Sequence, residues 1–291
     1  MTNLIMKKPY GELFVHKYHN KVFYNNLWDT DPNLLESRGK VTDADDNVIA
    51  LPFKKIFNYK EKDTICDLDK VIIAVRKMNG FMLHVTHNKK YGNIIGTTGS
   101  LKSDFVDLGT DVLTKFKIDI DYFKEANLLL GRKLTFIFEI QDKERDPHII
   151  EEEDGVYLLG IRDVDTGELL SQPTCDFISN IINAKRPDWK IAKFGDILEE
   201  VKQVDHEGFV IYDMETNEGL LKLKSPYYLS KKWVMRRNGE KMFYDDYKRR
   251  MDEEYYPIVK HIRTNYTKDQ WAEMSEQARG ELFDELLKQY R

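Results

Sequence analysis

The stretch that most constrains the fold covers residues 71–87, where two apolar, β-branched runs flank the sequence Arg-Lys-Met-Asn-Gly. Runs of this kind predict two strands, each buried on at least one face. Asn-Gly is a common hairpin signal, so we expect the strands to fold back on each other at Asn79-Gly80. Lys77 would then lie at a strand end among apolar residues. Burial disfavours the charged form of a lysine, and a free amine can act as a nucleophile. A solvated lysine at a hairpin tip is the commoner case.

Composition and charge favour a soluble globular chain and exclude several classes of function. Of 291 residues, 41% are hydrophobic and 33% are charged, and no apolar run approaches the length of a membrane-spanning helix. The N-terminus lacks the apolar core of a secretion signal, so we expect a cytoplasmic protein. Cys66 and Cys175 lack paired spacing, which argues against a disulfide framework or a zinc site. A net charge of −5 excludes a general nucleic-acid-coating protein, so any phosphate contacts must come from local basic patches.

The apolar pattern divides the chain into a part rich in strands and a helical part. We expect a hairpin within 38–53, a turn over 91–104, helices over 107–126 and 191–204, and strands over 134–140, 156–161, 207–212 and 220–224. Ser225-Pro226 is an N-cap followed by proline at the first helical position, and Thr267 is a second N-cap. Helical periodicity continues from Ser225 to the end. We therefore predict two domains, 1–225 and 226–291.

Five short features follow one another in a fixed order. They are Arg38-Gly39, Lys77-x-Asn79-Gly80, Phe138-Glu139, Glu207-Gly208-x-Val210 and Lys222-x-Lys224. Each one is weak by itself: a glutamate at a strand end is usually solvated, and two lysines on one strand face usually mark the wet side of a sheet. The ordered set is much harder to obtain by chance.

This set resembles the motifs of the covalent nucleotidyltransferases, which comprise ATP-dependent RNA and DNA ligases and mRNA capping enzymes. The resemblance is greatest to the RNA ligase 1 family, phage enzymes that reseal cleaved tRNA anticodon loops. Further matching stretches are Lys-Ile-Phe-Asn (55–58), Gly-Ser-Leu-Lys-Ser (99–103), Arg-Asp-Val-Asp-Thr-Gly-Glu-Leu (162–169) and Lys-Leu-Lys-Ser-Pro-Tyr-Tyr (222–228). The resemblance covers roughly residues 13–232. It implies an α+β fold: a mainly antiparallel-sheet nucleotidyltransferase core, similar to ATP-grasp ligases, followed by a small all-helical C-terminal domain.

Two positions depart from the family pattern. Asn79 stands where this family usually has aspartate, although plant and fungal tRNA ligases also resemble this chain in having asparagine there. Thr98 stands where the family tends to have a lysine. The contact normally made from that second position is therefore open.

The resemblance implies a reaction in three steps: a lysine takes AMP from ATP, the AMP passes to an RNA 5′-phosphate, and an RNA 3′-hydroxyl displaces it. Lys77 would be the nucleophile, assisted by Lys222 and Lys224 as catalytic cations. Glu207 would hold a divalent metal, Mg²⁺ or alternatively Mn²⁺. The implied ATP and AMP contacts are Arg38, Lys55, Lys77, Asn79, Gly80, Glu139, Glu207, Lys222, Lys224 and Tyr228. For Tyr228, a core tyrosine is the competing interpretation.

The expected partner is single-stranded or loop-nicked RNA with 5′-phosphate and 3′-hydroxyl ends, tRNA among the candidates, bound by a monomer away from any membrane. Basic and aromatic residues alternate over 231–250, which suits RNA, although the aromatic rings could equally pack the helices together. Two alternatives stay open: an RNA-end adenylyltransferase that seals poorly, and a catalytically idle RNA-binding module. A DNA ligase or capping enzyme is disfavoured, because the tail predicts helices and not a barrel domain.

Overall fold

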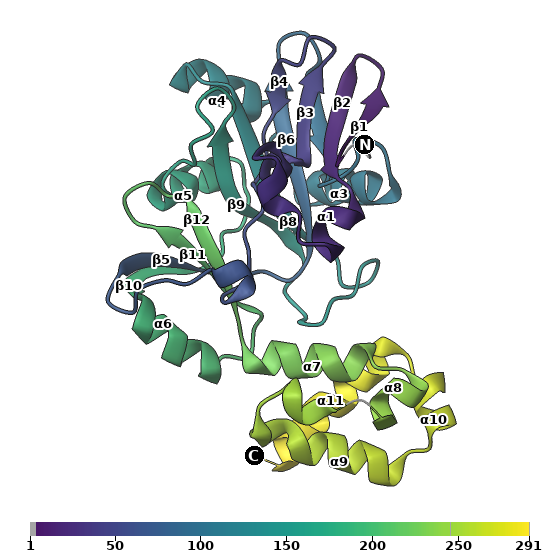
Figure 1. The fold of residues 1–291 in the computed structure, drawn as a ribbon. Coiled ribbons are helices and arrows are strands. Elements are labelled where there is room, and N and C mark those ends of the chain that lie inside the picture. Colours follow the sequence, from purple (N-terminus) through teal and green to yellow (C-terminus); the bar gives the residue numbers. More distant parts are fainter. Residues whose placement is uncertain (1–3, 245, 291) are drawn as a thin grey trace.

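The computed structural model describes residues 4–244 and 246–290, and its strands form three antiparallel sheets of four strands each (Figure 1). The first sheet contains, in spatial order, β1 (Ile5–Tyr10), β2 (Leu13–Tyr18), β3 (Arg38–Asp43) and β4 (Val48–Ala50). Helices α1 (Asn20–Tyr24) and α2 (Asn33–Glu36) connect β2 to β3. The hairpin predicted within 38–53 is confirmed by the pairing of β3 with β4.

The other two sheets are formed by strands from the middle of the chain. One has the order β10 (Trp189–Lys193), β5 (Val71–Arg76), β11 (Gly208–Asp213) and β12 (Gly219–Lys224). The other has the order β7 (Gly92–Gly96), β6 (Phe81–Asn88), β8 (Leu134–Gln141) and β9 (Gly155–Asp163). We refer to them as the β5 sheet and the β8 sheet. The strands predicted around 134–140, 156–161, 207–212 and 220–224 are thereby confirmed.

The predicted hairpin at Asn79-Gly80 is wrong, because β5 and β6 belong to different sheets. Strand β5 pairs with β10 and β11, whereas β6 pairs with β7 and β8. Neither Asn79 nor Gly80 adopts the positive φ that a two-residue hairpin turn requires. Residues 77–80 instead cross from one sheet to the other. Gly80 is needed for close approach, since a Cβ atom there would lie 2.2 Å from the carbonyl oxygen of Ile140.

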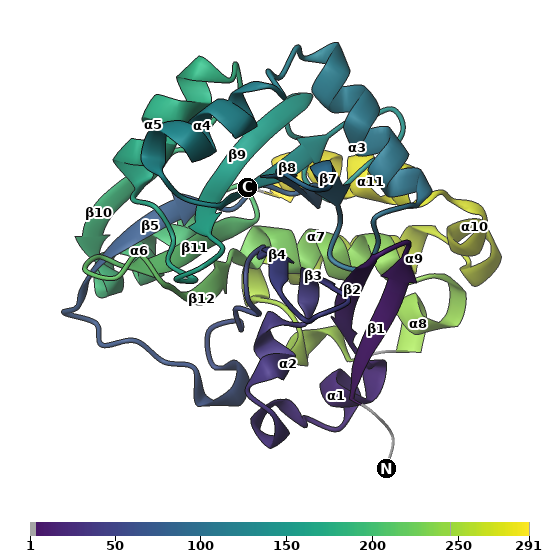
Figure 2. The same cartoon turned by 90° about the horizontal axis from the view of Figure 1, so that it is seen from above.

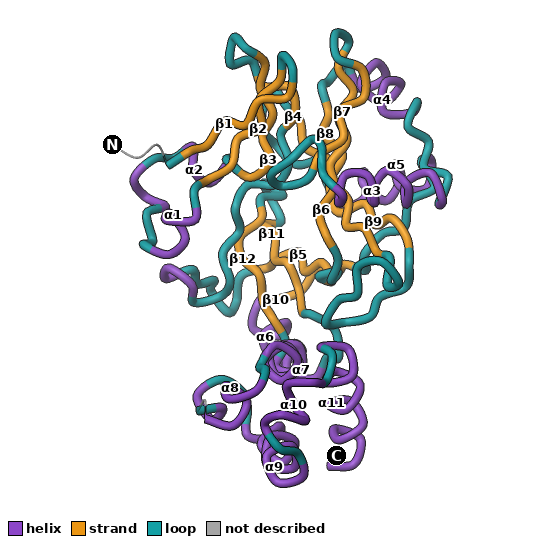
Figure 3. The backbone as a smooth tube through the Cα atoms, turned by 90° about the vertical axis from the view of Figure 1, so that its right-hand side faces the viewer, coloured by secondary structure: helices purple, strands orange, loops and turns teal. Residues whose placement is uncertain are grey.

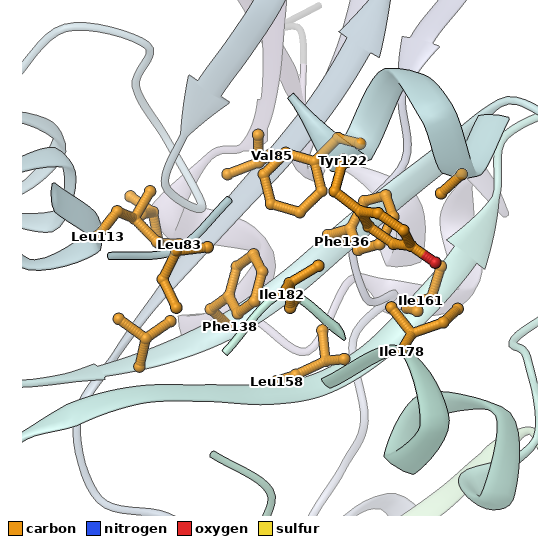
Figure 4. Packing of buried hydrophobic residues seen from close by; sticks show 14 of the residues in the cluster. Leu83, Val85, Leu113, Tyr122, Phe136, Phe138, Leu158, Ile161, Ile178 and Ile182 are labelled. Atoms are coloured by element: carbon orange, nitrogen blue, oxygen red, sulfur yellow. The ribbon is translucent and has the colours of Figure 1, made fainter. Parts of the chain in front are cut away.

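One face of the β8 sheet is covered by α3 (Asp104–Lys115), α4 (Tyr122–Leu130) and α5 (Gln172–Ile181) (Figure 2). Because side chains alternate along a strand, Phe136 and Phe138 of β8 point into this helix-covered core (Figure 4). Glu139 therefore points to the opposite face. Since β8 is buried along its whole length, that opposite face is also enclosed.

Three local predictions differ from the structure. The helix expected over 107–126 is split into α3 and α4, and Lys117 between them has a left-handed φ of 55°. The segment 191–204 begins as edge strand β10 and continues as α6 (Phe194–Glu200), because pairing with β5 overrides the helical pattern at its start. The expected turn over 91–104 contains strand β7, and α5 was not predicted.

In the described residues after β12, which are 225–244 and 246–290, the regular structure is helical. The helices are α7 (Pro226–Arg236), α8 (Gly239–Tyr244), α9 (Tyr256–Asn265), α10 (Lys268–Glu273) and α11 (Glu276–Tyr290) (Figure 3). Short 3-10 turns occupy Trp28–Thr30, Glu61–Asp63, Val201–Gln203, Tyr247–Arg249 and Glu253–Tyr255. Both predicted N-caps are confirmed, since Ser225 Oγ accepts the Tyr228 N–H and Thr267 forms a capping box with Gln270. The α+β fold with a helical C-terminal region is also confirmed.

The helical region has its own apolar core, which includes Trp233, Tyr247, Trp271 and Phe283. Packing therefore explains three of the aromatic residues that alternate with basic ones, Trp233, Tyr247 and the partly buried Phe243, whereas Tyr244 is exposed. The boundary near Ser225 stays a prediction, because α7 also packs on residues 149–150 of the preceding part. Among the helices of the described ranges, none is both long and apolar enough to cross a membrane.

Gly80→Ala is expected to destabilise the protein by about 3 kcal/mol, because the added Cβ would overlap the Ile140 carbonyl and force the backbone apart. Gly131→Ala is the matched control. Gly131 has a φ of +61° but no heavy atom within 4 Å of its Cβ position, so only conformational strain of about 1 kcal/mol is expected. Urea unfolding followed by circular dichroism measures both variants. Equal losses would contradict the close approach.

Candidate active site

A cavity of about 290 Å³ lies between the β5 sheet and the β8 sheet, beside the start of β3. Five of the predicted site residues line it: Arg38, Lys77, Gly80, Glu139 and Lys222. A larger cavity of about 650 Å³ lies between α7, α11 and residues 147–151, but none of the predicted site residues lines it. The smaller cavity is therefore the candidate site on chemical grounds.

Lys77 follows the last residue of β5 and is fixed at both its backbone and its side chain. Its N–H donates to the Gly208 carbonyl at 2.9 Å. Its Nζ donates to Glu207 Oε2 at 2.8 Å and to the Met78 carbonyl at 3.1 Å. The expected apolar surroundings are thus only part of the environment, since a buried carboxylate faces the amine. Nucleophilic attack by Lys77 requires loss of a proton and release from this ion pair.

Glu207 is 2% exposed and joins two lysines across the β5 sheet. Its Oε2 accepts from Lys77, and its Oε1 lies 3.1 Å from Lys224 Nζ at the end of β12. Burial would raise the pKa of the Glu207 carboxyl, but the charges of Lys77 and Lys224 outweigh burial and hold the pKa below its usual value. The carboxylate is therefore ionised and fully engaged.

The side chains around Glu207 could bind a divalent cation only with additional ligands from outside the protein. Within residues 4–244 and 246–290, no group of three or more His, Cys, Asp or Glu side chains could enclose a metal. Glu207 could supply one carboxylate oxygen, with the remaining ligands coming from phosphate and water, as Mg²⁺ commonly accepts. The predicted metal role of Glu207 stays a prediction.

Asn79 and Tyr228 support Glu207 and do not line the cavity. Asn79 Nδ2 donates to Glu207 Oε2 at 2.8 Å, and its Oδ1 accepts the Ile150 N–H at 3.0 Å. The Tyr228 ring lies 4.9 Å from Lys224 Nζ and is buried in a small apolar cluster. Burial and the nearby Glu207 raise the pKa of Tyr228. Asn79 is thus a positioning residue, and Tyr228 combines a core position with a contact to the ionic cluster.

Arg38 and Lys222 bring positive charge to the cavity wall without a matching carboxylate. In the described part of the chain, neither side chain forms an ion pair; Arg38 Nη1 lies 3.9 Å from Met82 Sδ. Burial lowers the pKa of Lys222 to about 7, and the charges of Arg38 and Lys77 contribute to this shift. Burial also lowers the pKa of Arg38. An anion in the cavity would relieve the repulsion between these groups.

Glu139 lies on the wall formed by the β8 sheet, as its place in the strand predicts. Its Oε1 accepts the Gly80 N–H at 3.0 Å. Burial raises the pKa of the Glu139 carboxyl, and Lys77 only partly offsets this. The contact places a hydrogen-bond acceptor with fixed geometry at the opposite side of the cavity from Lys222.

Lys55 is one of the five predicted contacts that do not line the cavity; the others are Asn79, Glu207, Lys224 and Tyr228. Its Nζ lies 4.0 Å from Glu61 Oε1 and 5.1 Å from the centre of the Phe57 ring. The neighbouring Lys54 lines the cavity in its place. Lys224 is likewise outside the lining, behind Glu207.

Sequence reasoning missed Arg76 and Glu152. Arg76 lines the cavity, and its Nη2 pairs with Glu152 Oε2 at 2.8 Å. The position of Arg76 beside Lys77 was a usable signal for its proximity. No sequence pattern marked Glu152, which the loop before β9 brings to this place. Thr98 also lines the cavity, so the departure from the family pattern falls on the site itself.

A solved structure of an archaeal ligase shares the fold, and other RNA ligases are similar over part of the chain. An archaeal ATP-dependent RNA ligase (form 1) aligns with 99% of this chain and 74% of its own, with a TM-score of 0.57 and 12% identity. The Naegleria gruberi RNA ligase with PPi aligns with 56% of this chain and 52% of its own, with a TM-score of 0.45 and 18% identity. A mutant of the same ligase with ATP and Mn has a TM-score of 0.47, 16% identity and coverage of 61% and 57%.

The chain thus spans about half the length of the Naegleria gruberi structure with PPi. A search of curated proteins finds no match. A protein-family model described as RNA ligase matches residues 36–256, a range that contains every predicted site residue from Arg38 to Tyr228. The chain therefore belongs to the RNA ligase family.

Proposed function

We propose that this protein is an ATP-dependent RNA ligase that acts through a covalent Lys77–AMP intermediate. The observation that carries the proposal is the convergence of Lys77, Glu139, Lys222 and Arg38 on one cavity. Membership of the RNA ligase family supports it, as does the fold shared with an archaeal ATP-dependent RNA ligase. Arg38 and Lys222, which form no ion pair with the residues that the structure describes, suit a polyphosphate, and the adjacent Lys77 amine suits attack on it.

In the first step, the free amine of Lys77 attacks the α-phosphorus of ATP. A nitrogen–phosphorus bond forms, the bond to pyrophosphate breaks, and the amine proton is lost. Lys222 and Arg38 stabilise the negative charge that develops on the phosphates, and Glu139 accepts hydrogen bonds from ribose hydroxyls. A divalent cation, Mg²⁺ or Mn²⁺, held in part by Glu207, would neutralise phosphate charge.

In the second step, the AMP passes from Lys77 to an RNA 5′-phosphate, which forms a phosphoanhydride and restores the amine. An RNA 3′-hydroxyl then attacks the 5′-phosphate and releases AMP. The same cations can serve each step, because negative charge develops on a phosphate beside them every time, on the AMP phosphate in the first two steps and on the RNA 5′-phosphate in the third. We propose repair of broken RNA in the cytoplasm as the role, by a monomer and with tRNA among the candidate substrates.

An RNA-end adenylyltransferase with weak sealing is the second candidate. It is favoured by the make-up of the cavity, since Lys77, Glu139 and Lys222 would suffice for transfer of AMP to the lysine and on to an RNA end.

Lys77→Ala is expected to abolish covalent labelling by ATP carrying radioactive α-phosphate, with Mg²⁺ present and RNA absent, on a denaturing gel. Lys77→Arg should also take no label, although it retains a cation opposite Glu207. Lys133→Ala is the control, because Lys133 is exposed and pairs only with Asp165. A labelled band that persists in Lys77→Ala would overturn the assignment of the nucleophile. No label in folded wild-type protein would favour the idle RNA-binding alternative.

ATP affinity is expected to fall as the pH rises above about 7, because Lys222 loses its proton through a pKa of about 7. The decrease should be up to about tenfold per pH unit. Lys222→Arg, which stays charged, should flatten the dependence. Lys222→Met should weaken binding about 10- to 100-fold near pH 6, the value of a charged hydrogen bond. Calorimetry with a non-hydrolysable ATP analogue measures all three proteins.

The same group affects stability in a defined direction. Lysine in the unfolded chain titrates near 10.5, whereas folded Lys222 titrates near 7. The unfolded state binds more protons between these values, so wild-type stability falls as the pH falls from about 10.5 towards 7. Lys222→Met should lose this pH dependence in thermal unfolding. Equal pH profiles for the two proteins would contradict a buried, partnerless Lys222.

Wild-type protein is expected to seal a pre-adenylated RNA to an RNA 3′-hydroxyl in a single turnover without ATP. The reason is that the Lys222 and Arg38 charges can act on the RNA-bound phosphate as on ATP. Gel analysis of end-labelled strands measures the product. Adduct formation on Lys77 without any sealed product would favour the adenylyltransferase alternative.

A further inference from the structure

Helix α1 holds two aromatic rings on the surface. Phe23 is 54% exposed and Tyr24 is 78% exposed, and their rings form an edge-to-face pair with centres 5.7 Å apart. Val22 between Lys21 and Phe23 is fully buried against Trp28 and Leu34, which anchors the helix. The two rings are therefore held in place at the surface by the packing of their neighbour.

Lys55 connects these rings to the candidate active site. Its Nζ lies 5.9 Å from the centre of the Phe23 ring and 5.4 Å from that of Trp28. Its side chain is only 12% exposed. Burial lowers the pKa of Lys55, Glu61 partly offsets this, and the charges of Arg38 and Lys224 lower the pKa further. Lys55 thus interacts electrostatically with the cavity residue Arg38 and contacts the Phe23 ring of the aromatic pair.

We propose that Phe23, Tyr24 and Lys55 form a docking platform for the single-stranded end of the RNA substrate, with unpaired bases on the rings and a backbone phosphate at Lys55. This inference rests on the proposed function, because it concerns the strand whose terminal phosphate reaches the cavity. It also accounts for Lys55, the cation that sequence analysis assigned to ATP and that the cavity leaves out.

The chemistry of the platform favours RNA over a protein partner. Exposed rings beside a cation suit the stacking of unpaired bases and contact with phosphate. Two rings are too small a surface for a stable protein interface, which buries about 800 Å² on each partner. The nearby carboxylates are already engaged by protein groups. Asp29 pairs with Lys62 at 2.8 Å, and Glu61, which forms a long ion pair of 4.0 Å with Lys55, also accepts a hydrogen bond from Asn58.

The position of α1 agrees with this role. In Figures 1 and 3, α1 lies at the end of the first sheet that is nearer to the C-terminal helices. Strand β2, which leads into α1, pairs with β3, and β3 begins with the cavity residue Arg38. An RNA strand that crosses the platform would therefore run beside β3, the strand whose first residue, Arg38, lines the cavity.

The test uses a fluorescent, 5′-phosphorylated single-stranded RNA of about 12 nucleotides, within the usual length of a single-strand site. Phe23→Ala and Tyr24→Ala are each expected to weaken binding in fluorescence anisotropy about 5- to 150-fold, the value of one stacked base. Phe177→Ala on α5 is the matched control, since Phe177 is 65% exposed and lies outside the platform. The control should bind as wild type does.

An abasic RNA distinguishes stacking from other effects of the substitutions. Removing bases along the RNA should weaken binding to wild type about as much as the double variant Phe23→Ala plus Tyr24→Ala weakens binding of intact RNA. The double variant should lose little further affinity for abasic RNA. Wild-type affinity of the double variant, or losses that simply add, would overturn the platform.

The failure of this inference is distinguishable from failure of the ligase proposal. Labelling of Lys77 by ATP needs no RNA, so the platform variants should take label as wild type does. Loss of RNA binding with normal labelling supports the platform. Ring-dependent RNA binding by a protein that takes no label would retain the platform and contradict the ligase proposal. Because both rings are exposed, the variants should unfold thermally at the same midpoint as wild type.

Discussion

The buried Glu207 carboxylate is the constraint on which the site depends. Burial of an isolated carboxylate is strongly unfavourable, but Lys77, Lys224 and Asn79 together occupy both of its oxygens. These three partners come from the end of β5, the end of β12 and the crossing between two sheets. One carboxylate therefore fixes the position of Lys77 relative to β12, which carries Lys222 and Lys224, and Asn79 extends the network to residue 150.

The positive charges at the site differ in whether a carboxylate neutralises them. Lys77 and Lys224 are compensated by Glu207, whereas Lys222 and Arg38 have no carboxylate partner in the described part of the chain. Bringing uncompensated cations together lowers stability, as the depressed pKa of Lys222 indicates. The same repulsion becomes favourable interaction energy when phosphates enter. In the proposed reaction, bound phosphate would therefore relieve a repulsion between cations that is already present in the folded protein.

The aromatic residues divide into two groups with different physical roles. In the helical region, Trp233 and Tyr247 are buried, so their alternation with basic residues reflects helix packing. On α1, Phe23 and Tyr24 are exposed. Their helix is short and carries no sequence pattern from which this exposure could be predicted. Burial, which depends on distant segments, decides which rings are available to bases. Lys55 shares features of both groups: its amine lies over the Phe57 ring, and the charge of the cavity residue Arg38 acts on it.

Local pattern and spacing in the sequence were enough to predict the strands that carry Glu139, Lys222 and Lys224, the strand that Glu207 precedes, the N-caps at Ser225 and Thr267, and the ordered motifs of the family. Which strands pair depends on packing between distant segments and could be seen only in the folded chain. The Asn79-Gly80 turn was mispredicted because a strong local signal was overridden: β5 and β6 each found partners in separate sheets, and Gly80 serves a close approach to Ile140. Three further features could not be predicted from the sequence: the Glu207–Lys77 ion pair, the placement of Lys55 outside the cavity and the Arg76–Glu152 pair. Each depends on residues that are brought together by sheet packing and not by sequence spacing.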